Sequence, residues 1–370
     1  MNILENKLRN NKRILNHAEL IEEKTKKISP ETPLVEFHPT NKCNLNCKHC
    51  TYEDKGDLTY PFKNLKFLKS LKPQGIVIAG GGEPTLYEDS GKGFSDMIIR
   101  LRSLLYQTRF GLITNGTIIP PGHWMEELSW IRISLDEIKD ENFQRNRGGE
   151  LKKVMKNIFL YLKSPIPHVG VGFLVHNENI RKVVECSRFI YESVIKELGK
   201  EYLKKINIQF RKCCKIDSCN CPSKVYMNRD DACSTRSKNW KEAIIANKEK
   251  IQSLSGPFRE FLEDRTNIKN IEKDHRLTKF KNCYLSLARV IIMSSGELHP
   301  CVIRASQGLK SIGNIQDTYP EEIAGLQKRF FQMENCNMRD CCRIDSSKNA
   351  IVEKHLLEEK EKPLIADPFF

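Results

Sequence analysis

The chain has 370 residues, 39% of them hydrophobic and 29% charged, which excludes disorder as the main state and predicts a core domain with smaller additions. No apolar run reaches the ~18–20 residues of a membrane span, and residues 1–11 lack the apolar stretch of a signal peptide. We therefore expect a cytoplasmic protein with no membrane partner. The formal net charge of +14 is evenly spread, without a basic stripe interleaved with aromatic residues, so no nucleic-acid partner is expected.

Residues 1–32 carry apolar side chains at mixed helical spacing and predict one or two short helices. From residue 33 to residue 235, short apolar runs alternate with helical stretches long enough to be crossovers. This predicts an α/β fold, a partial (β/α)6 TIM-like barrel with parallel strands. The expected strands are residues 34–37, 75–79, 110–114, 130–135, 169–175 and 206–211, and the expected helices are residues 64–71, 94–105, 151–162 and 180–198.

The regular pattern stops after residue 211. The expected units beyond the barrel are a helical linker (236–279, with a helix at 240–254), a small Cys-rich auxiliary domain (280–350), and a C-terminal helix and tail (351–370). Within the auxiliary domain the pattern predicts a hairpin, from a strand at 289–293 to a return strand ending at Cys301, and then a helix at 321–331.

Fourteen cysteines need an explanation, because in a reducing compartment clustered thiols usually bind metal or do redox work. Cys43, Cys47 and Cys50 lie within eight residues, on the loop that leaves the first expected strand. Three thiolates on one loop suit three irons of a four-iron cluster, whose last iron stays open for an exchangeable ligand. The alternative is a structural zinc site completed by His38 or His49, since C-x2-C is also a zinc spacing.

Polar residues end the next three expected strands. Residues 80–85, Gly-Gly-Gly-Glu-Pro-Thr, end the second strand, and Glu83 offers a carboxylate that would accept from a ligand ammonium. Thr114-Asn115-Gly116 ends the third strand, and Ser134-Leu135-Asp136 ends the fourth. Because barrel enzymes keep their ligand-binding loops at the carboxyl ends of the strands, these residues predict one ligand pocket.

The cysteine triplet, the Gly81-Gly82-Glu83-Pro84 turn and the two later polar strand ends resemble, in order and position, radical S-adenosylmethionine (radical SAM) enzymes. The resemblance covers residues 33–214. It implies that Cys43, Cys47 and Cys50 ligate a 4Fe-4S cluster whose open iron binds S-adenosylmethionine. Reductive cleavage of that cofactor releases a 5'-deoxyadenosyl radical. The protein orients the cofactor, and the cofactor supplies the radical chemistry.

The same resemblance implies roles for single residues. Glu83 would bind the methionyl ammonium, Ser134 with Asp136 the ribose or carboxylate side, and Arg145, with Arg147 as a close rival, the cofactor carboxylate. Phe173 to Val175, on the fifth strand, would pack against the adenine, with a place in the barrel core as the alternative for Phe173. Arg211 ends the sixth strand at the mouth. The full set of expected cofactor-binding residues is Gly81, Gly82, Glu83, Pro84, Thr114, Asn115, Ser134, Asp136, Arg145, Val175 and Arg211.

A second set of cysteines follows a C-x12-G-x4-C pattern, from Cys283 to Cys301 across the expected hairpin. Cys336 with Cys341 or Cys342 would complete a four-thiolate site. The pattern resembles the start of the SPASM domain and of its shortened relative, the twitch domain, which implies one auxiliary 4Fe-4S cluster. A zinc ribbon at the same position is the alternative.

Five cysteines directly follow the sixth expected strand or lie soon after it: Cys213, Cys214, Cys219, Cys221 and Cys233. Cys213 and Cys214 are the candidate catalytic residues, because a thiol facing the active site would return a hydrogen atom to a substrate radical. A small zinc loop or a further cluster is the alternative. Cys186, on a helical stretch with apolar neighbours, is expected to be a small core residue.

These features predict a radical SAM enzyme that abstracts a hydrogen atom from a ribosomally made peptide, for crosslinking, oxidation or epimerisation. The resemblance also implies an electron donor such as flavodoxin or ferredoxin. One alternative is a dehydrogenase or epimerase of a sugar, aminocyclitol or nucleoside in a biosynthetic pathway. The other is a non-catalytic zinc protein associated with nucleic acid, which would need neither Glu83 nor the polar strand ends.

Overall fold

A computed structural model describes residues 11–52, 56–175, 179–212, 238–268, 280–306, 308–332 and 343–357. Its centre is one eight-stranded sheet with the strand order β10-β9-β1-β2-β5-β6-β7-β8. The strands of this sheet are β1 (Leu34–Phe37), β2 (Gly75–Ile78), β5 (Arg109–Thr114), β6 (Leu128–Ser134), β7 (Val169–Val175), β8 (Ile206–Lys212), β9 (Arg289–Ile292) and β10 (Leu298–His299). A separate small hairpin joins β3 (Glu88–Asp89) to β4 (Lys92–Gly93).

The six strands from β1 to β8 in this sheet are parallel and follow one another in chain order. This confirms the predicted partial barrel, and all six strand predictions fall within two residues of the observed bounds. In the described residues β8 and β10 end the sheet, so the barrel does not close. Side chains on one face of each strand meet the helices, whereas the other face lines the inside of the barrel.

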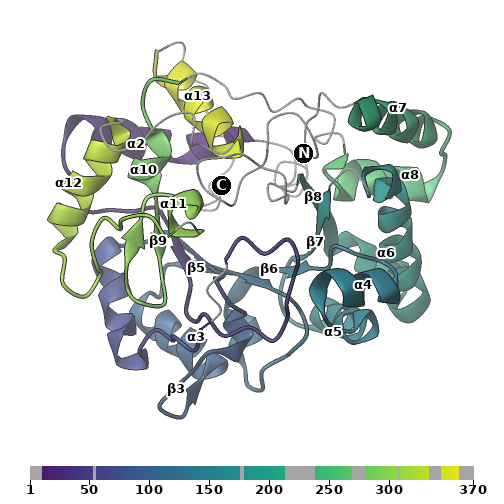
Figure 1. Cartoon of the computed structure of the whole chain (residues 1–370), viewed down its shortest axis with the longest axis horizontal. Coiled ribbons are helices and arrows are strands. Elements are labelled where there is room, and N and C mark those ends of the chain that lie inside the picture. The colour runs from purple at the N-terminus through teal and green to yellow at the C-terminus, as the bar shows by residue number, and fades with distance from the viewer. Residues whose placement is uncertain are drawn as a thin grey trace.

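Helices cover the outer side of the curved sheet (Figure 1). The 3-10 helices are η1 (Asn11–His17), η2 (Phe62–Leu71), η3 (Pro84–Leu86), η4 (Trp124–Glu127), η5 (Ile180–Lys182) and η6 (Lys200–Lys204). The α-helices are α2 (Ala18–Lys26), α3 (Phe94–Leu104), α4 (Asp140–Arg147), α5 (Leu151–Lys163), α6 (Val183–Leu198), α7 (Lys238–Gln252), α8 (Pro257–Arg265), α10 (Tyr284–Ala288), α11 (Val302–Ser306), α12 (Pro320–Phe331) and α13 (Arg343–Leu357). The main core lies between these helices and the sheet.

The C-terminal hairpin belongs to the barrel sheet. β9 pairs in parallel with β1, with Leu34 opposite Arg289 and Phe37 opposite Ile292, and β10 returns antiparallel beside β9. The expected hairpin is present, and its two strands extend the barrel sheet beyond β1. Its apolar strand covers β1, which would otherwise be an exposed sheet edge.

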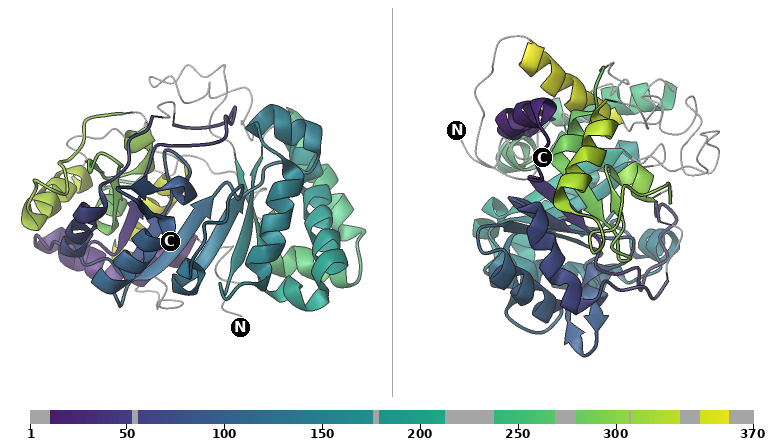
Figure 2. Two further views of the ribbon diagram at one scale, coloured as in Figure 1. Left: turned by 90° about the horizontal axis from the view of Figure 1, so that it is seen from below. Right: turned by 90° about the vertical axis from the view of Figure 1, so that its left-hand side faces the viewer.

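The N-terminal helices pack on the C-terminal part of the chain. Ile14, Leu15 and Ile21 share a second core with Leu285 and Val352, among others. Figure 2 shows α2, in purple, close to α13, in yellow. The N-terminal helices therefore lie on the region that was expected to form the auxiliary domain.

Among the described residues the α-helices α4, α8, α10 and α11 were not predicted, and α4 and α8 support the edges of the site region. Helix α4 follows β6, and α8 lies in the expected linker beyond its predicted helix. Beyond α8, the Asn267 side chain bonds both the backbone N–H and the carbonyl of Phe210 on the edge strand β8. No helix among the described residues has the length and apolar character needed to cross a membrane.

Candidate active site at the carboxyl ends of the strands

The loop with Cys43, Cys47 and Cys50 follows β1 and is held on two sides by backbone hydrogen bonds. On one side the Glu83 N–H donates to the Lys42 carbonyl at 2.7 Å. On the other side the N–H groups of Asn46 and Lys48 donate to the carbonyls of Arg147 and Asn146 at the end of α4. The loop is thereby fixed between the glycine-rich turn after β2 and the helix after β6.

The three thiols gather in one partly exposed region. Each cysteine is partly exposed. Burial raises the pKa of the Cys47 thiol; the Arg147 guanidinium opposes this rise, and Asp136, Cys50 and Cys43 add to it. In the described part of the chain, no three His, Cys, Asp or Glu side chains converge as a site for one metal ion. A four-iron cluster does not need such convergence, because each cysteine binds a different iron.

Gly82 lies against the cysteine loop at a distance that no other residue tolerates. A Cβ atom at this position would stand 2.2 Å from the Lys42 carbonyl oxygen and 2.5 Å from the Asn41 carbonyl carbon. Both neighbours are backbone atoms, so neither can rotate away. The glycine is therefore required for the close approach of the turn to the loop that carries the thiols.

Glu83 is 2% exposed, and both of its carboxylate oxygens accept hydrogen bonds from the protein. Oε1 accepts from the Thr114 hydroxyl at 2.6 Å and from the hydroxyl and N–H of Thr85 at 2.7 and 3.1 Å. Oε2 accepts from the Asn115 N–H at 2.6 Å. Burial raises the pKa of Glu83, and the bonds from Thr114, Asn115 and Thr85 oppose that rise. The carboxylate thus joins the ends of β2 and β5, and its expected role as an ammonium acceptor stays a prediction.

A second set of hydrogen bonds ties the cysteine loop to the turn after β5. Asn115 Nδ2 donates to Asn44 Oδ1 at 2.9 Å, and Asn44 Nδ2 donates to the Thr117 hydroxyl at 2.9 Å. Asn115 Oδ1 accepts from the hydroxyl and N–H of Thr117. Sequence reasoning missed Asn44 and Thr117, although each stands within two residues of a predicted site residue.

The buried arginine beside the thiols is Arg147. Its Nη1 donates to Asp136 Oδ2, while Asp136 Oδ1 accepts from the Leu174 N–H at 2.8 Å. The Arg147 Nε is buried and has no hydrogen-bond partner among the described residues. Arg145 is exposed and bonds Asn142 on its own helix. The choice of Arg145 is therefore corrected to Arg147, because two positions on a helix differ in direction by roughly 200°.

The other expected cofactor residues lie on different faces of the sheet. Val175 was assigned to the adenine, but its side chain lies in the core between sheet and helices; strand alternation turns it away from the barrel interior, which corrects the assignment. Ser134 stands on the inner face at the end of β6, opposite Gly172. Arg211 is also on the inner face, where its Nη2 lies 3.5 Å from the Cβ position of Gly172.

Cys283 precedes α10, and Cys301 precedes α11; both are partly exposed. Asn349 on α13 donates to the Cys283 sulfur at 3.7 Å. Cys186 is buried in the main core. The remaining cysteines of the predictions lie outside the described residues: Cys213, Cys214, Cys219, Cys221, Cys233, Cys336, Cys341 and Cys342.

The described residues fit a 4Fe-4S cluster with a carboxylate-bearing ligand. Three thiols on one fixed loop supply the soft donors that iron–sulfur clusters take. The buried Arg147 Nε beside them is a donor that a ligand carboxylate would satisfy, since buried polar atoms in native structures are nearly always paired.

Comparison with known proteins places this site in a family. The model of the radical SAM superfamily matches residues 37–190. The chain is 26% identical over 163 residues to Fe-coproporphyrin III synthase of Methanosarcina barkeri, covering 41% of this chain and 39% of that protein. It is 28% identical over 167 residues to an S-adenosylmethionine-dependent nucleotide dehydratase of Lacinutrix mariniflava, covering 41% of this chain and 33% of that protein. The match thus spans well under half the length of these two relatives.

Two solved structures share the fold over most of the chain. SuiB of Streptococcus suis bound to the precursor peptide SuiA has a TM-score of 0.57 at 14% identity, covering 88% of this chain and 74% of that one. Native anSMEcpe with bound AdoMet and Cp18Cys peptide has a TM-score of 0.55 at 18% identity, covering 84% and 87%. Residues 37–190, with the cysteine triplet and the Gly-Gly-Glu-Pro turn, therefore form a radical SAM superfamily domain.

Proposed function

We propose that the chain is an enzyme that reductively cleaves S-adenosylmethionine and abstracts a hydrogen atom from a peptide. The observation that carries this proposal is the placement of three partly exposed cysteines beside the buried Arg147–Asp136 pair. A purely structural zinc site would require neither that pair nor the bonded Glu83 carboxylate. When bound, the cluster and its cofactor would supply the 5'-deoxyadenosyl radical.

In this proposal the residues around the thiols orient the cofactor. Cys43, Cys47 and Cys50 hold the cluster, and Arg147 binds the methionyl carboxylate through the N–H groups that Asp136 leaves available. Asp136 is held by the Leu174 N–H, so the guanidinium stays in one orientation. Ser134, on the inner face, is assigned to the ribose side.

Glu83 acts as a positioning residue in this proposal. Its carboxylate fixes Thr114 and Asn115, and Asn115 in turn holds Asn44 next to Cys43. Gly81, Gly82 and Pro84 shape the turn that presses on the same loop. The glycine-rich turn and the end of β5 would thereby keep the thiols in place when the cluster is loaded.

A peptide is the proposed substrate. The two solved structures described above, which share this fold, each hold a peptide, and the net charge of +14 suits an acidic precursor. The similarity to a nucleotide dehydratase supports the second candidate, a nucleoside or nucleotide. Cys283 and Cys301, with Cys336 and either Cys341 or Cys342, are assigned to one auxiliary 4Fe-4S cluster.

Two further assignments belong to the same proposal. Cys213 and Cys214 follow β8 directly, and a thiol there would return a hydrogen atom to a substrate radical. Flavodoxin or ferredoxin would supply the electron for cofactor cleavage.

The test of cofactor cleavage is anaerobic reconstitution with iron and sulfide, followed by assay of 5'-deoxyadenosine with dithionite and S-adenosylmethionine. Cys43→Ala, Cys47→Ala and Cys50→Ala should each abolish the product. Cys186→Ala removes a thiol from the helix core and should retain it. Full product formation by the three loop variants would refute the proposal.

The test of substrate class uses the stimulation of 5'-deoxyadenosine formation. Peptides encoded next to the gene are compared with nucleoside triphosphates and sugars, and products are read by mass spectrometry. A peptide that raises the rate and changes in mass supports the proposal, whereas a change confined to nucleotides transfers it to the second candidate.

A further inference from the structure

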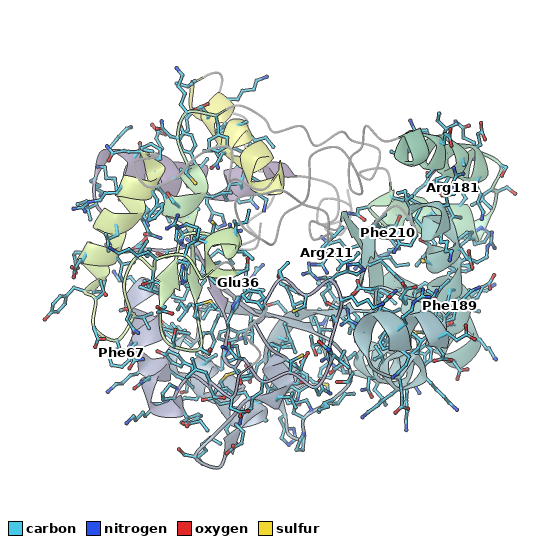
Figure 3. All side chains as sticks on the ribbon, viewed as in Figure 1. Glu36, Phe67, Arg181, Phe189, Phe210 and Arg211 are labelled. Atoms are coloured by element: carbon cyan, nitrogen blue, oxygen red, sulfur yellow. The ribbon has the colours of Figure 1, made fainter. Side chains whose placement is uncertain are left out.

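Charged side chains from both halves of the sheet face the inside of the barrel. The strand register places Glu36 of β1 and Arg289 of β9 on that face, together with Arg132 of β6 and Arg211 of β8. In Figure 3 Glu36 and Arg211 both lie in the middle of the molecule, Glu36 on the side of β9 and Arg211 beside Phe210. Polar groups on the inner face of a barrel mark the place where a ligand would be held.

Two glycines on β7 lie against these arginines. A Cβ atom on Gly170 would lie 3.5 Å from the Arg132 Cγ, and one on Gly172 would lie 3.5 Å from the Arg211 Nη2. The two arginine side chains therefore extend across β7, with Arg132 reaching Gln209 Oε1 through Nη1 at 2.7 Å. The Nε atom of Arg132 is buried and has no hydrogen-bond partner among the described residues.

Glu36 is a carboxylate that lies near Arg132 and Arg289. Glu36 accepts from His38 Nε2 at 3.0 Å. Burial raises the pKa of Glu36, but His38, Arg289 and Arg132 together lower it overall. Burial and then Arg211 lower the pKa of Arg132, which Glu36 and Asp136 oppose. Asp136 is already bound to Arg147, and Glu36 to His38.

We propose that Arg132 and Arg211 form a subsite inside the barrel for an anionic group, a carboxylate or a phosphate, on the substrate. Guanidinium groups recognise both anions through paired N–H bonds. The buried Nε atom of Arg132 would gain a partner. A cationic aminocyclitol would be repelled. This proposal rests on the proposed enzyme function, since it names what that enzyme's substrate carries.

This subsite is distinct from the one assigned to the cofactor carboxylate. Arg147 is the arginine that influences the Cys47 thiol, whereas Arg132 is influenced by Arg211 and Glu36. Asp136, the ion-pair partner of Arg147, acts on both arginines. Arg211, expected from the resemblance to contact the cofactor, is reassigned to the substrate here.

The test titrates the reconstituted full-length chain with inorganic phosphate and with acetate at constant ionic strength, by calorimetry. We expect saturable binding of at least one of the two anions, about tenfold weaker in Arg132→Gln and Arg211→Gln. Arg109→Gln, which removes an exposed arginine at the start of β5, should bind within about twofold of the wild type. Tighter phosphate binding assigns a phosphorylated substrate, and tighter acetate binding assigns a carboxylate.

A second titration, with S-adenosylmethionine at saturating anion, separates the two sites. Unchanged affinity for S-adenosylmethionine supports the proposal, whereas competition would assign the arginines to the cofactor. Absence of saturable anion binding, or equal loss in Arg109→Gln, would also overturn it. Thermal melting checks each variant, and Arg211→Gln, at the strand end, carries the test if Arg132→Gln does not fold. Anion binding needs no cofactor cleavage, so this proposal and the proposed function fail independently.

Discussion

Asn115 and Asn44 are joined by a hydrogen bond of 2.9 Å between their side-chain amides. This bond links the turn after β5 to the residue that follows Cys43. Because the Asn115 backbone N–H also donates to Glu83 and its Oδ1 accepts from Thr117, one buried residue connects the turn after β5 with the glycine-rich turn and the cysteine loop. The cysteine loop therefore depends on groups far from it in sequence.

Replacing Asn115 with Ala should loosen the cysteine loop. The change removes the bonds that Asn115 makes to Asn44 and to the buried Thr117, which then keep only the bond to each other. Loss of these bonds costs about 1–3 kcal/mol of the free energy of unfolding. We expect faster loss of iron to a chelator from the reconstituted protein. Asn64→Ala is the matched control, since Asn64 bonds Gln316 by a similar amide pair at 2.7 Å elsewhere. Equal iron loss from both variants would contradict the link to the cysteine loop.

Gly82→Ala should disrupt the site through the backbone. The added methyl group would overlap the Lys42 carbonyl, so the turn and the cysteine loop must separate. We expect a lower melting temperature and no 5'-deoxyadenosine. Gly325→Ala is the control: its Cβ meets nothing within 4 Å in helix α12, so it should stabilise the protein by ~0.5–1 kcal/mol. Normal product formation by Gly82→Ala would show that the close approach is dispensable.

Arg147→Gln and Arg145→Gln should behave very differently. Loss of the Arg147 charge leaves Asp136 buried without its ion-pair partner, which costs about 3–5 kcal/mol in the free energy of unfolding. Formation of 5'-deoxyadenosine should fall at least about tenfold, the rate factor for one lost charge-assisted contact. Arg145→Gln changes an exposed residue and should stay within about 0.5 kcal/mol of the wild type. Denaturant titration and the cofactor-cleavage assay check both variants. Larger losses in Arg145→Gln than in Arg147→Gln would return the role of binding the cofactor carboxylate to Arg145.

The strands were predictable because their signal is local. β7, for example, is a seven-residue run rich in valine and glycine bounded by polar residues, and this pattern needs no tertiary information. The pairing of β9 with β1 was not predictable, since the two strands lie about 250 residues apart and no local pattern encodes a parallel partner.

Side-chain roles were predicted less well than strands. The position of Glu83 was correct as a strand end, but its four hydrogen-bond donors come from Thr85, Thr114 and Asn115. Thr114 ends β5 and Asn115 follows it, about 30 residues from Glu83 in the sequence, so the sequence offers no sign that the carboxylate accepts these bonds. Similarly, nothing in the order Arg145-Asn146-Arg147 indicates which arginine faces the thiols before the phase of α4 is known.

Lys24 should make stability depend on pH in the alkaline range. Its side chain, 2% exposed, donates to the Glu31 carbonyl and to Gln327 Oε1, which joins α2 to α12. Burial lowers the pKa of Lys24 to about 8, with Glu31 opposing. Between that value and the unfolded value of about 10.5, the unfolded chain binds more protons, so the free energy of unfolding gains from this residue as pH rises.

Urea denaturation of the wild type and Lys24→Met measures this gain. The wild-type protein should gain stability relative to the variant as pH rises from about 8 to about 10, with little relative change below about pH 7, where Lys24 is charged in both states. Lys26→Met, which removes an exposed lysine from the same helix, is the matched control, and the Lys24 slope must exceed its slope. A difference between wild type and Lys24→Met that stays constant across this range would show that Lys24 keeps its proton in the folded protein, and that the contact between α2 and α12 holds a charged ammonium.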